Sequence, residues 1–168
     1  MNFVDWFIQW IENRPYRKGH LYHADNSLYM KRYSIFETKW LSARVHNIAT
    51  EDRDVAMHDH PWSFISFVLR GAYLEERPMT IMPCFISDSC EESYGVKARR
   101  AGLKPAFRHA TDRHRISWVA PNTWTLFIYG PLRQWWGFYT PAGKIYFRDY
   151  LQSGSAFSPL NDIGEDLG

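Results

Sequence analysis

Short runs of β-branched and aromatic residues follow one another along most of this chain, separated by Gly, Pro, Asn or Asp. Such runs are typical of β-strands, because bulky side chains fit the pleated, half-buried surface of a sheet. No crossover helix separates the runs, so the pattern predicts an all-β, antiparallel sandwich or barrel. The expected strands are Leu28–Tyr33, Trp40–Ala49, Trp62–Leu69, Ala72–Glu76, Thr80–Ile86, Val96–Arg100, His114–Val119, Trp124–Tyr129, Trp136–Tyr139 and Lys144–Phe147.

One amphipathic helix is expected at the N-terminus, over residues 2–13. Asn2 is a suitable N-cap and Pro15 is a stop signal. The apolar stripe that predicts this helix consists of Phe3, Trp6, Phe7, Trp10 and Ile11. We expect the stripe to pack on the β domain as a lid. Binding to a partner or a membrane surface is the alternative, although the polar face carries few Lys and Arg for a membrane.

Length and composition predict a single domain over residues 1–152, followed by a flexible acidic tail over residues 153–168. A chain of 168 residues suits one core, and its 45% hydrophobic and 23% charged residues are normal for a globular protein. The tail carries three acidic residues and no basic one, so we expect it to be loosely held. The net charge of +2 is too small to predict a nucleic-acid partner.

Cysteine content and hydropathy predict a cytoplasmic protein without membrane association. No run reaches the roughly 18 apolar residues of a membrane span, and no basic leader precedes the expected helix. The two cysteines, Cys84 and Cys90, are too few for a disulfide scaffold, and we interpret them as free thiols. A small disulfide within one loop is the alternative.

The segment Met57–Trp62 carries the residues with the clearest chemistry, because His58 and His60 occupy alternate positions. On a strand, such residues face the same side and lie about 6.6 Å apart, so both imidazoles can reach one metal ion. His114, at the start of an expected strand, is the candidate third ligand, and His109 is the alternative. Three imidazoles suit zinc, iron, nickel or copper. A solvated histidine pair without a metal is the competing interpretation.

This segment resembles the first motif of the cupin superfamily, which combines an HxH pair, a following glutamate and a closing glycine. His58 and His60 match the pair, and Gly71 matches the closing glycine. Residues 108–118 resemble the second motif, with His114 in the place of its single histidine. The phrases HDHPWSF, TWTLFIYGP and WGFYTPAGKI make residues from about 41 to 150 similar to a cupin-like group of phage and bacterial genomes.

The resemblance implies a double-stranded β-helix, the cupin jelly roll, with a mononuclear metal site. The first motif departs from the family pattern at two positions: Asp52 replaces its first glycine, and Phe64 stands where the ligand glutamate is expected. In the second motif the glycines and the asparagine are missing, and Thr111 and Trp118 stand in their places. The remaining three-histidine set is like that of cupins resembling cysteine dioxygenase. The implied function is an iron-type oxygenase-like enzyme acting on a small molecule, with nickel or zinc as alternative metals. The alternative function is a non-catalytic cupin, such as a phage-type accessory protein, that binds a small ligand or partner. Analogy with other cupins implies a homodimer.

Four further residues are candidates for binding the substrate. Arg44 and His46 alternate on one expected strand and suit an anionic group, because guanidinium pairs well with carboxylate or phosphate. If Arg70 and Gly71 form a two-residue turn between the strands before and after them, Glu75 pairs with Ser66 across the hairpin. Glu75 then faces inward, where it supports a metal ligand or contacts substrate. Tyr129 is a candidate pocket wall. Surface or core positions are the alternatives for all four.

Overall fold

The computed structural model describes residues 1–14, 18–23, 25–79, 93–102, 104–152 and 157–158. The expected strand Thr80–Ile86, both cysteines and most of the predicted tail lie outside these residues. The elements are α1 (Phe3–Glu12), β1 (Lys18–His23), β2 (Leu28–Glu37), β3 (Ser42–Ile48), β4 (Met57–His58), β5 (Phe64–Arg70), β6 (Ala72–Met79), β7 (Ser93–Arg100), β8 (Ala106–Arg108), β9 (Arg115–Val119), β10 (Thr123–Tyr129), β11 (Gly137–Thr140), β12 (Gly143–Tyr146), α2 (Phe147–Gln152) and β13 (Phe157–Ser158).

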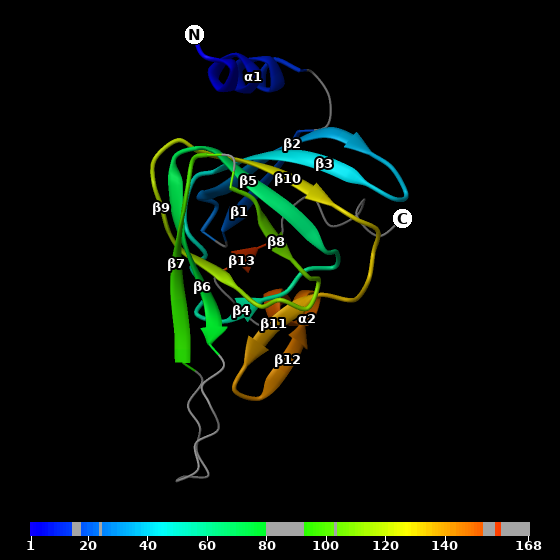
Figure 1. Cartoon of the computed structure of the whole chain (residues 1–168). Helices are drawn as coiled ribbons and strands as arrows, with labels where there is room; N and C mark the ends of the chain where they lie inside the picture. Colours follow the sequence, from blue (N-terminus) through cyan, green and yellow to red (C-terminus); the bar gives the residue numbers. More distant parts are fainter. Residues whose placement is uncertain (15–17, 24, 80–92, 103, 153–156, 159–168) are drawn as a thin grey trace.

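The strands form three antiparallel sheets (Figure 1). The largest has the order β13-β1-β2-β3-β10-β5-β8, and two three-stranded sheets have the orders β7-β6-β9 and β12-β11-β4. Strands of all three sheets line one central cavity, including β3 and β10 of the large sheet, β6 of the second and β11 of the third. This arrangement is a double-stranded β-helix with an N-terminal helix, so the predicted fold class is confirmed.

The expected pairing of Ser66 with Glu75 is wrong. β5 pairs with β10 and β8, whereas β6 pairs with β7 and β9, so the chain passes from one sheet to another between β5 and β6. Gly71, at this passage, has φ +75°, which favours glycine. A Cβ atom there would lie 2.4 Å from Thr123 Oγ1. Glycine is therefore required where the chain crosses from one sheet to another, and this segment is not a hairpin loop.

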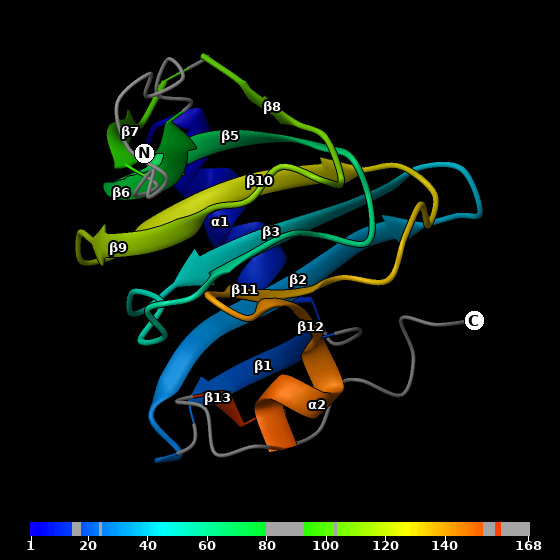
Figure 2. The same cartoon turned by 90° about the horizontal axis from the view of Figure 1, so that it is seen from below.

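Helix α1 packs on the outer face of the large sheet, opposite the cavity (Figures 1 and 2). The Asn2 side chain accepts a hydrogen bond of 2.8 Å from the amide of Asp5, as expected of an N-cap. The buried face is slightly rotated from the predicted one. Ile11 of the predicted stripe is buried as expected and is joined by Ile8, whereas Phe3 and Trp6 of the stripe are exposed.

Packing explains this rotation of α1. The branched aliphatic side chains of Ile8 and Ile11 join a cluster with Val45 and other residues of the sheet. Phe7 and Trp10 pack against the same cluster. The exposed ring of Trp6 stacks on Trp10, with 6.3 Å between centroids. In the part of the chain described, no helix combines the length and the apolar character needed to cross a membrane.

The predicted boundary after Gln152 stays a prediction. Within the segment assigned to the tail, the structure describes Phe157–Ser158, which pairs as β13 with the end of β1. The small helix α2 precedes this segment. Its buried residues Phe147 and Leu151 pack on Phe138 of β11.

Candidate metal centre

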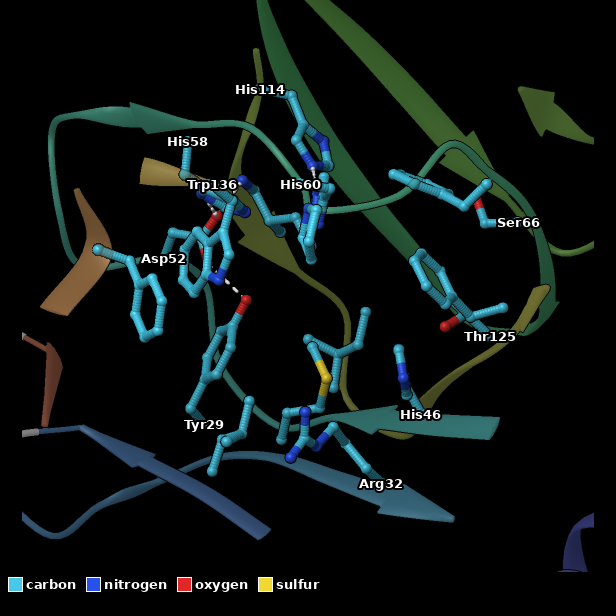
Figure 3. A pocket seen from close by; sticks show the side chains of 18 of the residues that line it. Tyr29, Arg32, His46, Asp52, His58, His60, Ser66, His114, Thr125 and Trp136 are labelled. Carbon is cyan, nitrogen blue, oxygen red and sulfur yellow. Dashed lines mark hydrogen bonds and ion pairs between the residues drawn. The ribbon is translucent and has the colours of Figure 1, made fainter. Parts of the chain in front are cut away.

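Three histidines converge at one end of the cavity (Figure 3). His58 ends β4, His60 follows two residues later, and His114 precedes β9. The backbones of His58 and His114 form a two-way bridge, with each amide donating to the other carbonyl at 3.0 Å. One ligand atom from each of the three imidazoles lies within 4.8 Å of the other two, and Nε2 of His60 lies 2.7 Å from Nε2 of His114. The sequence-predicted ligands are therefore brought together.

Asp59 anchors the segment that carries the histidine pair. Because side chains alternate along extended backbone, Asp59 points away from its two neighbours and is fully buried. Its carboxylate accepts four hydrogen bonds of 2.6–2.9 Å. These bonds compensate the cost of burying the charge. The donors are the Gly137 amide, Gln134 Nε2, Tyr139 Oη and Lys144 Nζ. Sequence reasoning missed this residue, whose only signal was its position between the two histidines.

Glu75 orients the imidazole of His114. Its Oε1 lies 2.8 Å from His114 Nδ1, which donates its proton and leaves Nε2 as the atom facing His60. Arg108 donates to both oxygens of Glu75, from Nε to Oε1 at 3.0 Å and from Nη2 to Oε2. Burial by itself raises the pKa of Glu75, but the bonds from His114 and Arg108 outweigh it and hold this pKa at about 2. The carboxylate is therefore ionised at neutral pH.

Asp52 is a second carboxylate that lies beside a histidine of the cluster, in this case His58. Its Oδ2 lies 3.9 Å from His58 Nδ1 and accepts the Ile116 amide at 2.7 Å, while Oδ1 accepts the Tyr29 hydroxyl at 2.5 Å. The sequence marked Asp52 only as a departure from the cupin motif. In the structure it is a buried carboxylate that fixes the side of the cavity next to His58.

Burial keeps the imidazoles of His58 and His60 neutral. Desolvation is the main cause that lowers the pKa of His58 to about 4, with His114 adding to the effect and Asp52 opposing it. Desolvation also places the pKa of His60 well below its usual value, reinforced by His114 and His58. A neutral imidazole has a lone pair for coordination, so protons do not compete with a metal at neutral pH.

The donor set fits a divalent transition metal. Three imidazole nitrogens without a carboxylate are ligands for borderline ions such as iron, nickel or zinc. Phe64 occupies the position of the motif glutamate, and its ring lies 4.8 Å from that of His60, so it contributes an apolar wall and no ligand. The cluster therefore supplies three ligands, and a small molecule can approach it from the cavity.

The cavity below the histidines has a volume of about 240 Å³. Its walls are mainly apolar, and its polar side chains are concentrated at a few positions, as in small-molecule sites. The aromatic residues of the wall are Tyr29, Trp62, Phe64, Tyr73, Phe127, Trp136, Phe138 and Phe147.

Of the other residues predicted to bind substrate, two line the cavity and Tyr129 does not. Arg44 and His46 line the cavity, and Arg44 is also paired with Glu37, from Nη2 to Oε1 at 2.9 Å. Tyr129 does not line it and instead lies behind Trp62, with ring centroids 4.5 Å apart.

The remaining histidines lie outside the cluster. His109, the alternative ligand, is exposed, and its ring contacts Phe107 at 4.8 Å. His23 is buried and lies 2.8 Å through Nε2 from the Thr50 hydroxyl. His20 lies 2.9 Å through Nδ1 from the Gly19 carbonyl. Among the described residues, the group that can hold a metal is His58, His60 and His114.

The fold and site together define a double-stranded β-helix with a three-histidine cluster inside it, and several solved structures are similar to the chain. One is an uncharacterized conserved protein with a double-stranded β-helix domain from Klebsiella pneumoniae, 16% identical, covering 82% of this chain and 95% of that one, with a TM-score of 0.46. A second is KdgF from Halomonas sp., 16% identical, covering 66% and 88%, with a TM-score of 0.45. A third is an RmlC-like cupin from Shewanella frigidimarina, 18% identical, covering 68% and 86%, with a TM-score of 0.41. No protein-family model and no curated protein matches the sequence.

Proposed function

We propose that this protein is a metal-dependent enzyme of the iron oxygenase type that acts on a small molecule, with O₂ as co-substrate. The observation that carries the proposal is the convergence of three imidazoles, with one ligand atom of each within 4.8 Å of the other two, at the wall of a mainly apolar cavity. Iron is the metal that we favour, and nickel and zinc suit the same donors. A bound ion would supply Lewis acidity and open coordination positions for substrate.

The residues of the chain have separate tasks in this proposal. His58, His60 and His114 hold the ion, while Glu75 keeps the proton of His114 on Nδ1 and so keeps Nε2 available. The aromatic walls exclude water and position the substrate. Asp59 holds the backbone of the histidine pair at a fixed distance from His114.

Location and assembly complete the proposal. We place the protein in the cytoplasm, where reduced iron is available, and we expect no nucleic acid or membrane as partner. We also expect a homodimer. Size-exclusion chromatography with light scattering would measure the mass of the particle and test this expectation.

The test of the metal proposal is stoichiometry. The protein, purified without an affinity tag, is loaded anaerobically with Fe(II), Ni(II) or Zn(II) in turn and analysed by elemental mass spectrometry. We expect about one ion per chain in the wild type and in the control variants His20→Ala and His109→Ala. His58→Ala, His60→Ala and His114→Ala should each lose affinity by orders of magnitude while keeping the wild-type circular dichroism spectrum. No ion in any wild-type sample would refute the proposal.

A non-catalytic cupin that binds a small ligand, such as a phage-type accessory protein, is the second candidate. The observation in its favour is that the carboxylates nearest the histidines are already engaged: Glu75 by His114 and Arg108, and Asp52 by Tyr29. Neither is placed to act as a general base. Absence of a bound metal after reconstitution, together with binding of a small ligand in the cavity, would favour this candidate.

A further inference from the structure

Two uncharged polar side chains lie next to each other on the large sheet, at the side of the cavity opposite the histidine cluster (Figure 3). They belong to His46 of β3 and Thr125 of β10, which are register partners on neighbouring strands. Residues in register on neighbouring strands project from the same face of a sheet, and both of these line the cavity. An imidazole and a hydroxyl are therefore presented to the same part of the cavity.

The Nε2 atom of His46 is buried and forms no hydrogen bond to any residue that the structure describes. A buried polar atom without a partner costs free energy, which a ligand atom at hydrogen-bond distance would recover. Burial is the main cause that lowers the pKa of His46 to about 3, with Arg32 and Arg44 adding to the effect. A ligand for this atom must therefore suit a neutral imidazole.

The charged side chains that line the cavity already have partners of their own. Among the described residues they are Arg32, Arg44, Asp52 and Asp54, so that their formal charges cancel. Arg32 is not without a partner. The other three take part in the contacts Arg44–Glu37 at 2.9 Å, Asp52–Tyr29 at 2.5 Å and Asp54–Tyr150 at 3.3 Å. The lining therefore offers no unengaged counter-ion to a charged ligand.

A hydroxyl is the ligand group that these observations favour. A neutral imidazole carries its proton on one of its two nitrogens, so Nε2 of His46 either donates or accepts. A hydroxyl suits both cases, because it can accept from Nε2 or donate to it, and it can pair with the Thr125 hydroxyl in either direction. A carboxylate can only accept, and its burial beside groups that already have partners would cost free energy.

One aromatic ring connects this patch to the histidine cluster. The Phe127 ring lies 5.1 Å from that of His46 and 6.3 Å from that of His60, measured between centroids. His46 is also close enough to contribute to the lowered pKa of His60. A single small molecule in the 240 Å³ cavity can therefore contact both ends.

We propose that the substrate is a small, uncharged and mainly apolar molecule that carries a hydroxyl group at one end. The hydroxyl binds His46 Nε2 and the Thr125 hydroxyl, the apolar part packs on Phe127, and the opposite end faces the three histidines. That the molecule is a substrate and reaches a bound ion rests on the proposed function, whereas the hydroxyl subsite stands on His46 and Thr125 alone.

Three hydroxamates that differ in one terminal group test the inference. The probes are 4-hydroxybutanohydroxamic acid, which ends in a hydroxyl, pentanohydroxamic acid, which ends in a methyl group, and the monohydroxamate of succinic acid, which ends in a carboxylate. Each is titrated into the Co(II)-loaded protein and followed by the visible spectrum of the ion.

The hydroxyl probe should bind most tightly to the wild type. We expect a preference of at least about fivefold over the methyl probe, because the methyl group leaves His46 Nε2 without a partner. We expect a preference of at least about tenfold over the carboxylate probe, because the buried charge meets no unengaged cation. Equal or tighter binding of either the methyl or the carboxylate probe would overturn the inference.

Two variants assign the preference to the patch. His46→Phe keeps an aromatic ring beside Phe127 and removes Nε2, and Thr125→Val keeps the shape of the side chain and removes the hydroxyl. Each should reduce the preference for the hydroxyl over the methyl probe to about twofold or less, while the affinity for the methyl probe and the metal content stay unchanged. His109→Phe, at an exposed histidine, is the matched control and should keep the full preference. A full preference in either variant would overturn the inference, and if one variant fails to fold the other decides alone.

A metal-free measurement separates this inference from the proposed function. 1-Pentanol and pentanoate are titrated into the apo protein while the ¹⁵N signals of the His46 ring are recorded. A shift with 1-pentanol and none with pentanoate supports the hydroxyl subsite, even if the chain fails to bind metal. The same response to both compounds, a response to pentanoate alone, or no response to either would overturn it.

Discussion

Among single residues, Glu75 controls the metal centre without being one of its ligands. It accepts the Nδ1 proton of His114 at 2.8 Å and is held in turn by Arg108. Glu75→Gln should lower metal affinity by about 10- to 100-fold, the usual cost of losing the partner that orients a ligand histidine. Competition with a chromogenic chelator would measure this affinity.

The neighbouring residue provides a matched control. Glu76 follows Glu75 on β6, points to the other face and accepts Arg115 Nε at 2.7 Å. Glu76→Gln should therefore bind metal as the wild type does. Wild-type affinity in Glu75→Gln would show that His114 does not depend on this carboxylate.

His46 should make the apo protein sensitive to acid. Its pKa is about 3 in the folded state, whereas the unfolded chain has the ordinary value of 6.5. Below pH 6.5 the unfolded state takes up a proton that the folded state refuses, so stability falls as pH decreases from 6.5 toward 3. In His46→Gln, the dependence of the unfolding free energy on pH should be weaker by up to about 1.4 kcal/mol per pH unit in this window.

Urea unfolding at several pH values would measure these slopes. His109→Gln, which changes an exposed histidine, is the control for the loss of an imidazole. Equal slopes in the wild type and in His46→Gln would contradict the expectation. Only the slope is compared, because the substitution also changes stability uniformly at all pH values.

At the level of the element, the rotation of α1 changes which side chain stabilises the lid. Ile11 is 1% exposed and Trp6 is 47% exposed. Ile11→Ala should cost about 2–5 kcal/mol, as for other buried aliphatic residues. Trp6→Ala should cost less than about 1 kcal/mol, because half of the ring already contacts water. Chemical denaturation of both variants would test this order, and a larger loss in Trp6→Ala would show that the aromatic flank is covered.

Long strands rich in apolar residues could be predicted from the sequence, and very short ones could not. β10 and β5 have seven residues each, enough for an apolar run to be visible. β4 has two residues and β8 has three, too few to show any period. The rotation of α1 was missed because Ile8, three residues before Ile11, fits helical spacing as well as the aromatic members of the stripe do.

The same distinction holds for the candidate site: residues identified by a local sequence pattern could be predicted, and residues that depend on a distant partner could not. His58 and His60 could be predicted because strand alternation acts within three residues. Arg108, which supports Glu75, could not be predicted. Its partner lies on another strand, 33 residues away along the chain. Pairings over such distances depend on strand order, which no local pattern contains.

For the whole molecule, the apolar clusters indicate a fold that does not need the metal. One cluster, which includes Ile11, Val45 and Trp124, lies between α1 and the outer face of the sheet, away from the histidines. Removal of metal by a chelator should leave the far-ultraviolet circular dichroism spectrum unchanged. Metal at 100 times its dissociation constant should add about 2.7 kcal/mol of stability, seen as a higher melting temperature. Unfolding by the chelator alone would contradict this expectation.

Two tryptophans beside the histidines have an optical consequence. The indole ring of Trp136 lies 6.2 Å from the ring of His58, and that of Trp62 lies 6.3 Å from the ring of His60. Excited indoles lose their energy to paramagnetic ions at such short range and keep it near closed-shell ions. Co(II) should therefore quench part of the tryptophan fluorescence of this chain, whereas Zn(II) should leave it unchanged. The intrinsic fluorescence of the unlabelled protein would then show which of the two ions is bound.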